Sequence, residues 1–260
     1  MQIRLNPVTL ITGAGSGIGA GCAQDLARKS TGGLLLADSD DAALGAVADE
    51  LDAAGVSPER ISTLAFDVTD MARWAQAADF IQGQYGRLDW AVVNTSAANG
   101  KPAESDLVDW GRTTSAQLEA TIQSLRTIMP LMAKNSQGGA IVVTTSAAAI
   151  KAEPLAPNAA PGLLQVMRAA SREAAHSNVR INAIAPGGAD TPMWNAMSWF
   201  QDLVRETGNE SAAFDKIAHM QPPIARYAQG GDVSRLIVML LAEEAPITGA
   251  TLVVDGGGTL

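Results

Sequence analysis

Cysteine and histidine are scarce in this chain of 260 residues, which contains one Cys and two His. The lone cysteine, Cys22, excludes an internal disulfide and a cysteine-based zinc site, and two histidines argue against a histidine-rich metal centre. We therefore expect no metal, and we interpret Cys22 as a small buried side chain of the first helix.

Long apolar runs are also missing. No stretch approaches the roughly 20 apolar residues that a transmembrane helix needs. The first residues show neither the apolar region nor the small-residue cleavage site of a secretory signal. The sequence therefore predicts a cytoplasmic protein.

Basic residues are outnumbered, with 18 Lys and Arg against 27 Asp and Glu and a net charge of −9. This balance argues against nucleic acid and anionic membranes as partners. A hydrophobic content of 47% with 17% charged residues excludes a disordered chain. Because no repeat, linker or break in composition interrupts the sequence, residues 1–260 are predicted to form a single domain.

Strand-like and helix-like segments alternate along the chain. The expected strands are 8–12, 34–37, 63–68, 88–94, 141–146, 179–185 and 251–255. The expected helices are 18–29, 41–54, 71–85, 108–135 with a disturbance at Pro130, 161–176, two within 193–220 broken near Gly208, and 232–241. This order predicts an α/β fold with one doubly wound parallel sheet between two layers of helices.

A glycine-rich turn joins the first expected strand to the first expected helix. Gly13, Gly17 and Gly19 would permit positive φ and let the backbone approach a pyrophosphate at the helix N-terminus. Asp38 ends the second strand, where its carboxylate could accept hydrogen bonds from an adenosine ribose. A 2′-phosphate beside Asp38 would meet like charge, so NAD is favoured over NADP. The alternative is a tight strand–helix turn without a ligand.

On this spacing the sequence resembles the short-chain dehydrogenase/reductase family, and the resemblance covers essentially the whole chain. It implies a Rossmann-like fold, a nicotinamide dinucleotide cofactor and hydride transfer between an alcohol and a ketone. The cofactor-binding residues it implies are Gly13, Ser16, Gly17, Ile18, Gly19, Asp38, Asp67, Val68, Asn94, Pro186, Gly187 and Thr191. Asp255-Gly256-Gly257 matches the C-terminal signature of the family. The helix containing 163–170 matches a family dimer interface, which implies a homodimer or homotetramer.

The catalytic residues of the family are only partly present. Ser146 matches the family's Ser, whereas Gln117 stands where its Asn is expected. The family's Tyr and Lys would fall on Ala159 and Leu163 or, with a shorter loop, on Ala156 and Ala160. No Tyr-x-x-x-Lys occurs anywhere in the chain. In the family the Tyr transfers the hydroxyl proton of the substrate, and the Lys lowers the pKa of that Tyr, because a phenol is a poor base at neutral pH without a nearby cation. Without this pair, a Ser alone cannot perform the proton transfer.

Other ionisable residues could replace the missing pair. Lys151 follows Ser146 on the loop expected at the active-site edge, Glu153 lies on the same loop, and His219 lies in the expected lid, residues 191–229. The alternative for each of these three residues is a solvated side chain without a catalytic role. His176 is expected to be a solvated side chain as well. An apolar cluster in the lid suggests an apolar small-molecule ligand or simple packing; its members are Met193, Trp194, Met197, Trp199 and Phe200.

Three hypotheses remain open. The chain is an oxidoreductase with a rebuilt proton-transfer group, a non-catalytic NAD(H)-binding protein, or a structural or regulatory subunit that binds no nucleotide. The glycine turn together with Asp38 speaks against the third.

Overall fold

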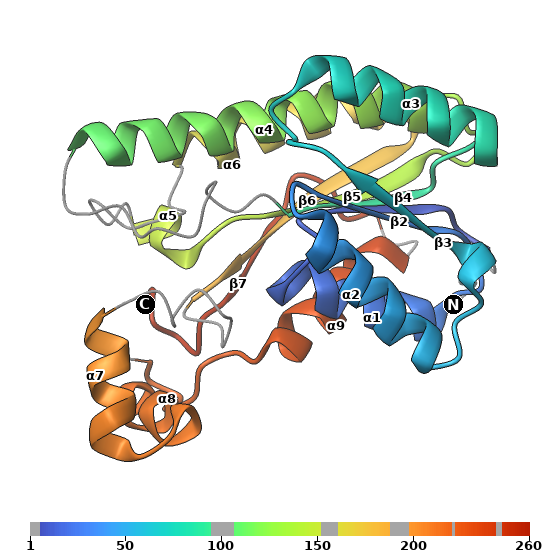
Figure 1. Ribbon diagram of the computed structural model, residues 1–260. Helices are drawn as coiled ribbons and strands as arrows, with labels where there is room; N and C mark the ends of the chain where they lie inside the picture. Colours follow the sequence, from blue (N-terminus) through green and yellow to red (C-terminus); the bar gives the residue numbers. More distant parts are fainter. Residues whose placement is uncertain (1–5, 95–106, 152–160, 188–197, 220–221, 243–245) are drawn as a thin grey trace.

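Seven parallel strands form one sheet in the computed structural model, which describes residues 6–94, 107–151, 161–187, 198–219, 222–242 and 246–260, without the side chains of 107–113 and 161. The strand order is β3-β2-β1-β4-β5-β6-β7 (Figure 1). The strands are β1 (Thr9–Thr12), β2 (Leu34–Asp38), β3 (Ile61–Ala65), β4 (Trp90–Val93), β5 (Gly139–Thr144), β6 (Val179–Pro186) and β7 (Thr251–Val254). The predicted doubly wound α/β fold is confirmed.

Helices cover both faces of this sheet (Figure 1). One layer consists of α1 (Gly17–Lys29), α2 (Asp41–Ala53) and α9 (Gly230–Ala242), and the other of α3 (Met71–Tyr85), α4 (Leu107–Ala133) and α6 (Pro161–Ala174). Short 3-10 turns occupy Pro58–Arg60 and Ala175–Ser177, and a short helix α5 (Ala147–Lys151) follows β5. Two further helices, α7 (Ser198–Thr207) and α8 (Glu210–Ala218), pack on each other beyond the carboxyl ends of β6 and β7.

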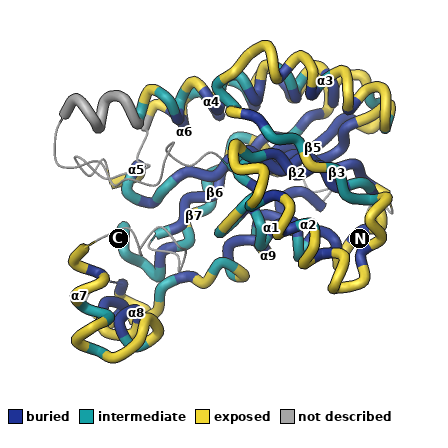
Figure 2. Tube along the Cα trace, in the orientation of Figure 1, coloured by how far each residue is buried: buried dark blue, intermediate teal, exposed yellow. Residues whose placement is uncertain are grey.

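The core consists of two apolar layers, one on each face of the sheet. In β5, Ile141 and Val143 face α3, α4 and α6, while Ala140 and Val142 face α1 and α9. Figure 2 shows the central strands buried and the outer sides of the helices exposed. Burial on both faces explains why the strands read as continuous apolar runs rather than alternating ones.

The helices differ from the sequence prediction at two places. The helix α4 ends at Ala133, two residues earlier than expected and three residues after Pro130, which removes one backbone hydrogen bond without interrupting the helix. The helix α5 was not predicted, since five residues are too few for a recognisable apolar period. The expected break near Gly208 is confirmed, with φ +90° at that glycine between α7 and α8.

Within the described residues, no helix has the length and apolar character needed to cross a membrane.

Candidate active site

The carboxyl ends of the strands form the edge of the sheet at which the predicted site residues gather. Strand β1 lies between β2 and β4, so the chain reverses its winding direction beside β1. In open parallel sheets ligands bind in the crevice outside the carboxyl ends at this reversal. The glycine turn follows β1, Asp38 ends β2 and Asn94 follows β4, so all three lie at the reversal.

The glycine turn admits no side chain at its key positions. Gly13 has φ +61°, and a Cβ there would lie 2.2 Å from the carbonyl oxygen of Asn94. Gly17 has φ +53°, and a Cβ on Gly19 would lie 2.0 Å from the Gly13 carbonyl oxygen. These contacts bring α1 against the turn and leave backbone facing the crevice, as a dinucleotide site requires.

The N-terminus of α1 is open to an anion. Its N-cap, Ser16, is exposed and makes no side-chain capping hydrogen bond, and the first turn contains no acidic residue. Ile18 instead packs against the apolar layer beneath. The first N–H groups of a helix without a side-chain cap, together with the helix dipole, fit a pyrophosphate.

Asp38 is held by backbone at the end of β2. Its Oδ2 accepts a 2.9 Å hydrogen bond from the Gly15 N–H, and its Oδ1 accepts one of 3.1 Å from the Asp40 N–H. The carboxylate is thereby fixed against the glycine turn, half-buried. A Cβ on Gly15 would lie 3.0 Å from Asp38 Oδ2 and 2.9 Å from Ala43 Cβ, so only glycine fits beside this carboxylate.

The turn after β3 lies next to Asp38, because Asp38 pairs with Ala65 in the sheet. Asp67 is exposed, and its Oδ1 accepts hydrogen bonds from both the N–H and the hydroxyl of Thr69. Val68 is half-buried, and its carbonyl accepts the Trp74 indole N–H at 2.8 Å. These hydrogen bonds give the turn a defined shape beside Asp38.

Asn94 ties three strands together. Its backbone N–H donates to the Thr12 hydroxyl at 3.0 Å, its Nδ2 donates to the Gly13 carbonyl at 3.2 Å, and its Oδ1 accepts from the Thr144 hydroxyl at 2.8 Å. Asn94 therefore fixes the glycine turn relative to β4 and β5. Sequence reasoning named Asn94 but assigned no role to Thr12 or Thr144, whose hydroxyls lie at the carboxyl ends of otherwise apolar strands.

Ser146 immediately precedes α5, and it is half-buried. Among the described residues its hydroxyl has one hydrogen-bond partner, the Ala148 N–H at 3.2 Å, which it accepts. The register pairs Thr144 with Ile184, which places Ser146 level with Pro186, the last residue of β6. Gly187 follows, and its N–H donates to the Val254 carbonyl at 3.0 Å. Ser146, Pro186 and Gly187 therefore lie side by side, while Thr191 lies outside the described residues.

The positions expected for the family's other catalytic residues are apolar or buried. Leu163 belongs to α6 and is buried in the core, and Gln117 is buried in α4. The other three positions, Ala156, Ala159 and Ala160, lie outside the described residues.

Among the described residues, none of the proposed replacements forms a hydrogen bond with Ser146. Lys151 ends α5 as an exposed side chain. His219 and His176 are exposed, and His219 Nδ1 lies 2.7 Å from the Asp215 carbonyl oxygen. Glu153 lies outside the described ranges. Cys22 is fully buried, and burial raises the pKa of its thiol, which confirms its packing role.

The helices α7 and α8, which belong to the predicted lid, have an apolar cluster of their own. Phe200 is fully buried, and its ring centroid lies 4.8 Å from that of Phe214. Tyr227 packs on this cluster, and burial raises the pKa of its phenol, so it does not supply a phenolate at neutral pH. Trp199 is half-exposed. Met193, Trp194 and Met197 lie outside the described residues.

Comparison with known proteins gives consistent matches over the whole chain. The family described as Enoyl-(Acyl carrier protein) reductase matches residues 13–259. D-threitol dehydrogenase of Mycolicibacterium smegmatis is 33% identical over 260 residues, covering 97% of this chain and 93% of that protein. L-sorbose reductase of Gluconobacter frateurii, complexed with NADPH and L-sorbose, has a TM-score of 0.84 at 25% identity, covering 100% of this chain and 99% of that chain. A 3-ketoacyl-(acyl-carrier-protein) reductase of Brucella melitensis, complexed with NADH, shares the fold with a TM-score of 0.77 at 24% identity, covering 99% of this chain and 100% of that chain.

Proposed function

Since this chain belongs to the short-chain dehydrogenase/reductase family, a family of nicotinamide-dependent oxidoreductases, we propose that it binds NAD(H) and interconverts an alcohol and a ketone without a Tyr–Lys pair. The observation that carries the cofactor choice is the anchored carboxylate of Asp38, hydrogen-bonded to the Gly15 N–H at 2.9 Å.

Asp38 favours NAD over NADP for two reasons. Its fixed oxygens can accept hydrogen bonds from ribose hydroxyls, whereas a 2′-phosphate at the same place would meet a like charge. A basic side chain that could neutralise such a phosphate does not fit at Gly15, where a Cβ would already meet Asp38 and Ala43.

The remaining cofactor contacts are assigned by position. The N-terminus of α1 at Gly17 would hold the pyrophosphate, and the turn at Asp67 and Val68 would flank the adenine. When bound, the nicotinamide would supply the hydride acceptor or donor, and the hydroxyl proton of the alcohol would leave to a base or to water. Ser146 would donate its hydroxyl hydrogen to the substrate oxygen while its own oxygen accepts the Ala148 N–H.

Loss of the family's Lys should weaken cofactor binding. A charge-assisted hydrogen bond contributes about 1.5–3 kcal/mol, which corresponds to roughly one to two orders of magnitude in affinity. Because the pyrophosphate and adenosine contacts lie elsewhere, we expect a micromolar dissociation constant rather than no binding.

Calorimetric titration with NADH and NADPH tests the cofactor proposal. We expect NADH to bind at least tenfold more tightly than NADPH. The Asp38→Ala substitution should weaken NADH binding by about 10-fold to 100-fold and reduce the difference in affinity between NADH and NADPH. Asp79→Ala, which removes an exposed carboxylate on α3, is the matched control. No binding of either dinucleotide at millimolar concentration would refute the proposal.

A second candidate is a non-catalytic NAD(H)-binding protein. This candidate is favoured because the Ser146 hydroxyl has a single hydrogen-bond partner within the described residues, and that partner is a backbone N–H rather than an ionisable side chain. Turnover of a panel of alcohols and ketones distinguishes the two: activity that Ser146→Ala lowers supports the enzyme, whereas NADH binding without turnover supports the non-catalytic protein.

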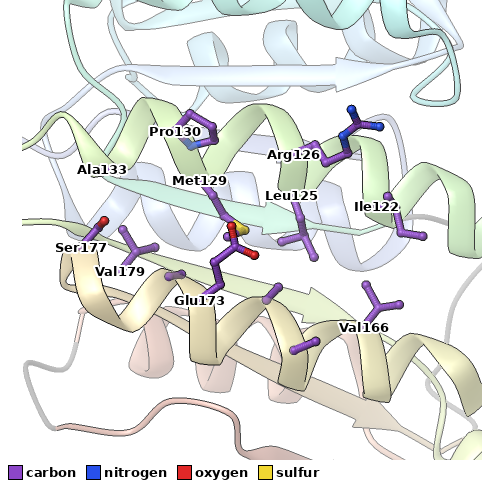
Figure 3. A pocket seen from close by; sticks show the side chains of 13 residues that line it. Ile122, Leu125, Arg126, Met129, Pro130, Ala133, Val166, Glu173, Ser177 and Val179 are labelled. Carbon is purple, nitrogen blue, oxygen red and sulfur yellow. The ribbon is translucent and has the colours of Figure 1, made fainter.

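We further propose that two copies of this chain pair through α4 and α6. A groove of about 590 Å³ runs between these helices, and its walls are mostly apolar (Figure 3). Arg126 lies on the α4 wall and Glu173 on the α6 wall, both exposed. Two-fold pairing could bring the Arg126 of one copy towards the Glu173 of the other, so the groove is complementary to itself.

Light scattering after size-exclusion chromatography tests this pairing. Val166→Asp, which places a charge among the groove's apolar side chains, should reduce the dimer to monomer, whereas Ala42→Asp on the exposed side of α2 should not. Arg126→Glu and Glu173→Arg should each weaken the dimer, and the double exchange should restore it. A mass unaffected by Val166→Asp would contradict the proposal.

A further inference from the structure

Two buried hydroxyls lie at the carboxyl end of β5. Thr144 ends the strand and Thr145 follows it, and both side chains are buried. The Thr145 N–H still donates to the Ile184 carbonyl at 2.9 Å, so the strand direction continues and the two side chains point to opposite faces of the sheet. Thr144 lies on the same face as Val142, which packs in the layer of α1 and α9. The Thr144 hydroxyl donates to Asn94 Oδ1 at 2.8 Å, whereas Thr145 Oγ1 has no partner among the described residues.

The Asn94 amide has one orientation that suits both of its neighbours. The Gly13 carbonyl oxygen can only accept a hydrogen bond, so Asn94 Nδ2 must face it, at 3.2 Å. Oδ1 then faces Thr144, and the threonine hydroxyl must be the donor. Turning the amide over would place two oxygen atoms against each other at Gly13. The Thr144 hydroxyl therefore supplies the donor that holds Asn94 in the orientation that Gly13 requires.

The peptide group that Asn94 holds is the centre of the glycine turn. The Gly13 carbonyl lies against the start of α1, where a Cβ on Gly19 would approach its oxygen to 2.0 Å. On the other side of the same peptide group, the Ala14 N–H donates to the Ala37 carbonyl at 3.1 Å. A line of hydrogen bonds thus runs from the end of β5 through Asn94 and the glycine turn to β2.

The link between Thr144 and Asn94 lies beyond the paired residues of their strands. The register of β4 and β5 ends at the pair Val93 and Val143, one residue before Asn94 and Thr144. Removing the Thr144 hydroxyl should therefore leave the backbone pairing of the two strands in place. Its effect should fall on the turn that Asn94 holds.

From this arrangement we infer that Thr144 is a positioning residue for the dinucleotide. Its hydroxyl holds the Asn94 amide, and the amide holds the Gly13 carbonyl, so the glycine turn has its binding shape before the cofactor arrives. The inference rests on the proposed NAD(H) binding and adds a residue that lies outside the cofactor contacts assigned above. A turn that adopts the binding shape only part of the time has its apparent affinity reduced by that fraction, because the ligand must then order it.

Thr144→Val tests this role, since it removes the hydroxyl and keeps the β-branched shape that a strand favours. Thr144→Ser keeps a hydroxyl and is the conservative rescue. Thr145→Val is the matched control, because it makes the same change at the next residue, whose hydroxyl has no partner among the described residues. Thr144→Ala removes the same donor if Thr144→Val does not fold.

Calorimetric titration with NADH gives the first measurement. We expect Thr144→Val to weaken NADH binding by about three- to tenfold, the range of one neutral hydrogen bond. Thr144→Ser and Thr145→Val should each bind NADH as the wild-type protein does.

Hydrogen exchange followed by mass spectrometry, on the protein without cofactor, separates positioning from a general loss of stability. Thr144→Val should speed exchange at Ala14 and Gly15, whose N–H groups donate to β2, and added NADH should restore their protection. A merely structural role of Thr144 would instead speed exchange along β5 and leave the turn as it is in the wild-type protein.

Unchanged NADH affinity in Thr144→Val, an equal loss in Thr145→Val, or a loss that Thr144→Ser does not rescue would each overturn the inference. Wild-type exchange rates at the glycine turn of Thr144→Val would overturn it as well. Failure of the wild-type protein to bind NADH would instead refute the proposed function. The exchange measurement, made without cofactor, would even then show whether Thr144 orders the turn.

Discussion

The glycine at position 13 offers a test in which backbone strain and steric contact can be separated. Gly13 combines φ +61° with a would-be Cβ contact of 2.2 Å to the Asn94 carbonyl oxygen. Gly55 has φ +87° with nothing within 4 Å, and Gly45, inside α2, also has nothing within 4 Å and no positive φ. Alanine therefore introduces backbone strain and a steric clash at position 13, backbone strain alone at position 55, and neither at position 45.

The magnitudes follow from those geometries. An alanine in the left-handed region costs about 1–2 kcal/mol, which is the whole effect expected for Gly55→Ala. In Gly13→Ala the carbonyl of Asn94 must also move by about 1 Å to reach an ordinary C···O separation. That movement weakens the Asn94 hydrogen bonds, each contributing about 0.5–1.5 kcal/mol, so we expect a total loss of about 3 kcal/mol. Gly45→Ala should gain about 0.5–1 kcal/mol from higher helix propensity.

Urea unfolding followed by circular dichroism measures the three free energies of unfolding. NADH titration supplies a second measurement, in which Gly13→Ala should lose binding and Gly55→Ala should keep it. If Gly13→Ala were no more destabilising than Gly55→Ala, the close approach of β4 to the glycine turn would not be what requires a glycine there.

Three further predictions concern titrating groups. The buried thiol of Cys22, whose pKa is raised by burial, should resist iodoacetamide in the native protein and react once urea unfolds it, as mass spectrometry would show. The pKa of Asp232 is lowered by the Gln229 N–H and then by the Arg226 guanidinium, so stability present above about pH 4 should be lost as the pH falls below it. Asp232→Asn should flatten that part of a stability–pH profile. Burial raises the pKa of Tyr227, so its contribution is present below about pH 10 and should be lost as the pH rises further, except in Tyr227→Phe.

Local patterns predicted the strands and most helices well. Leu34–Asp38 and Gly139–Thr144 are buried on both faces, which is why apolar runs identified them without alternation. The helix starting at Met71 was readable because Asp70 caps it and Trp74 repeats on its buried side. The short α5 escaped prediction because it has too few residues to show a period.

The site was only partly predictable for a different reason. Gly13, Gly17 and Asp38 are recognisable because one local strand–turn–helix unit and its neighbour contain them, and each residue type has few alternatives there. Nothing in the linear order signals that Thr144, 50 residues beyond Asn94, donates to its side chain, or that Asp255 closes over Gly187. Such contacts depend on which strands become neighbours in the sheet.

By itself, therefore, the sequence determined the α/β class, the dinucleotide-type glycine turn with its acidic partner, and the absence of a Tyr-x-x-x-Lys pair, because these are properties of residue identity and short-range spacing. Only the tertiary structure decided that β6 ends beside Ser146 with β7 on its far side, and that the Oδ2 of Asp255, after β7, is buried without a hydrogen-bond partner among the described residues. The physical reason is that parallel strands are joined by long crossovers, so residues far apart in the chain are brought together by sheet order and register rather than by local sequence.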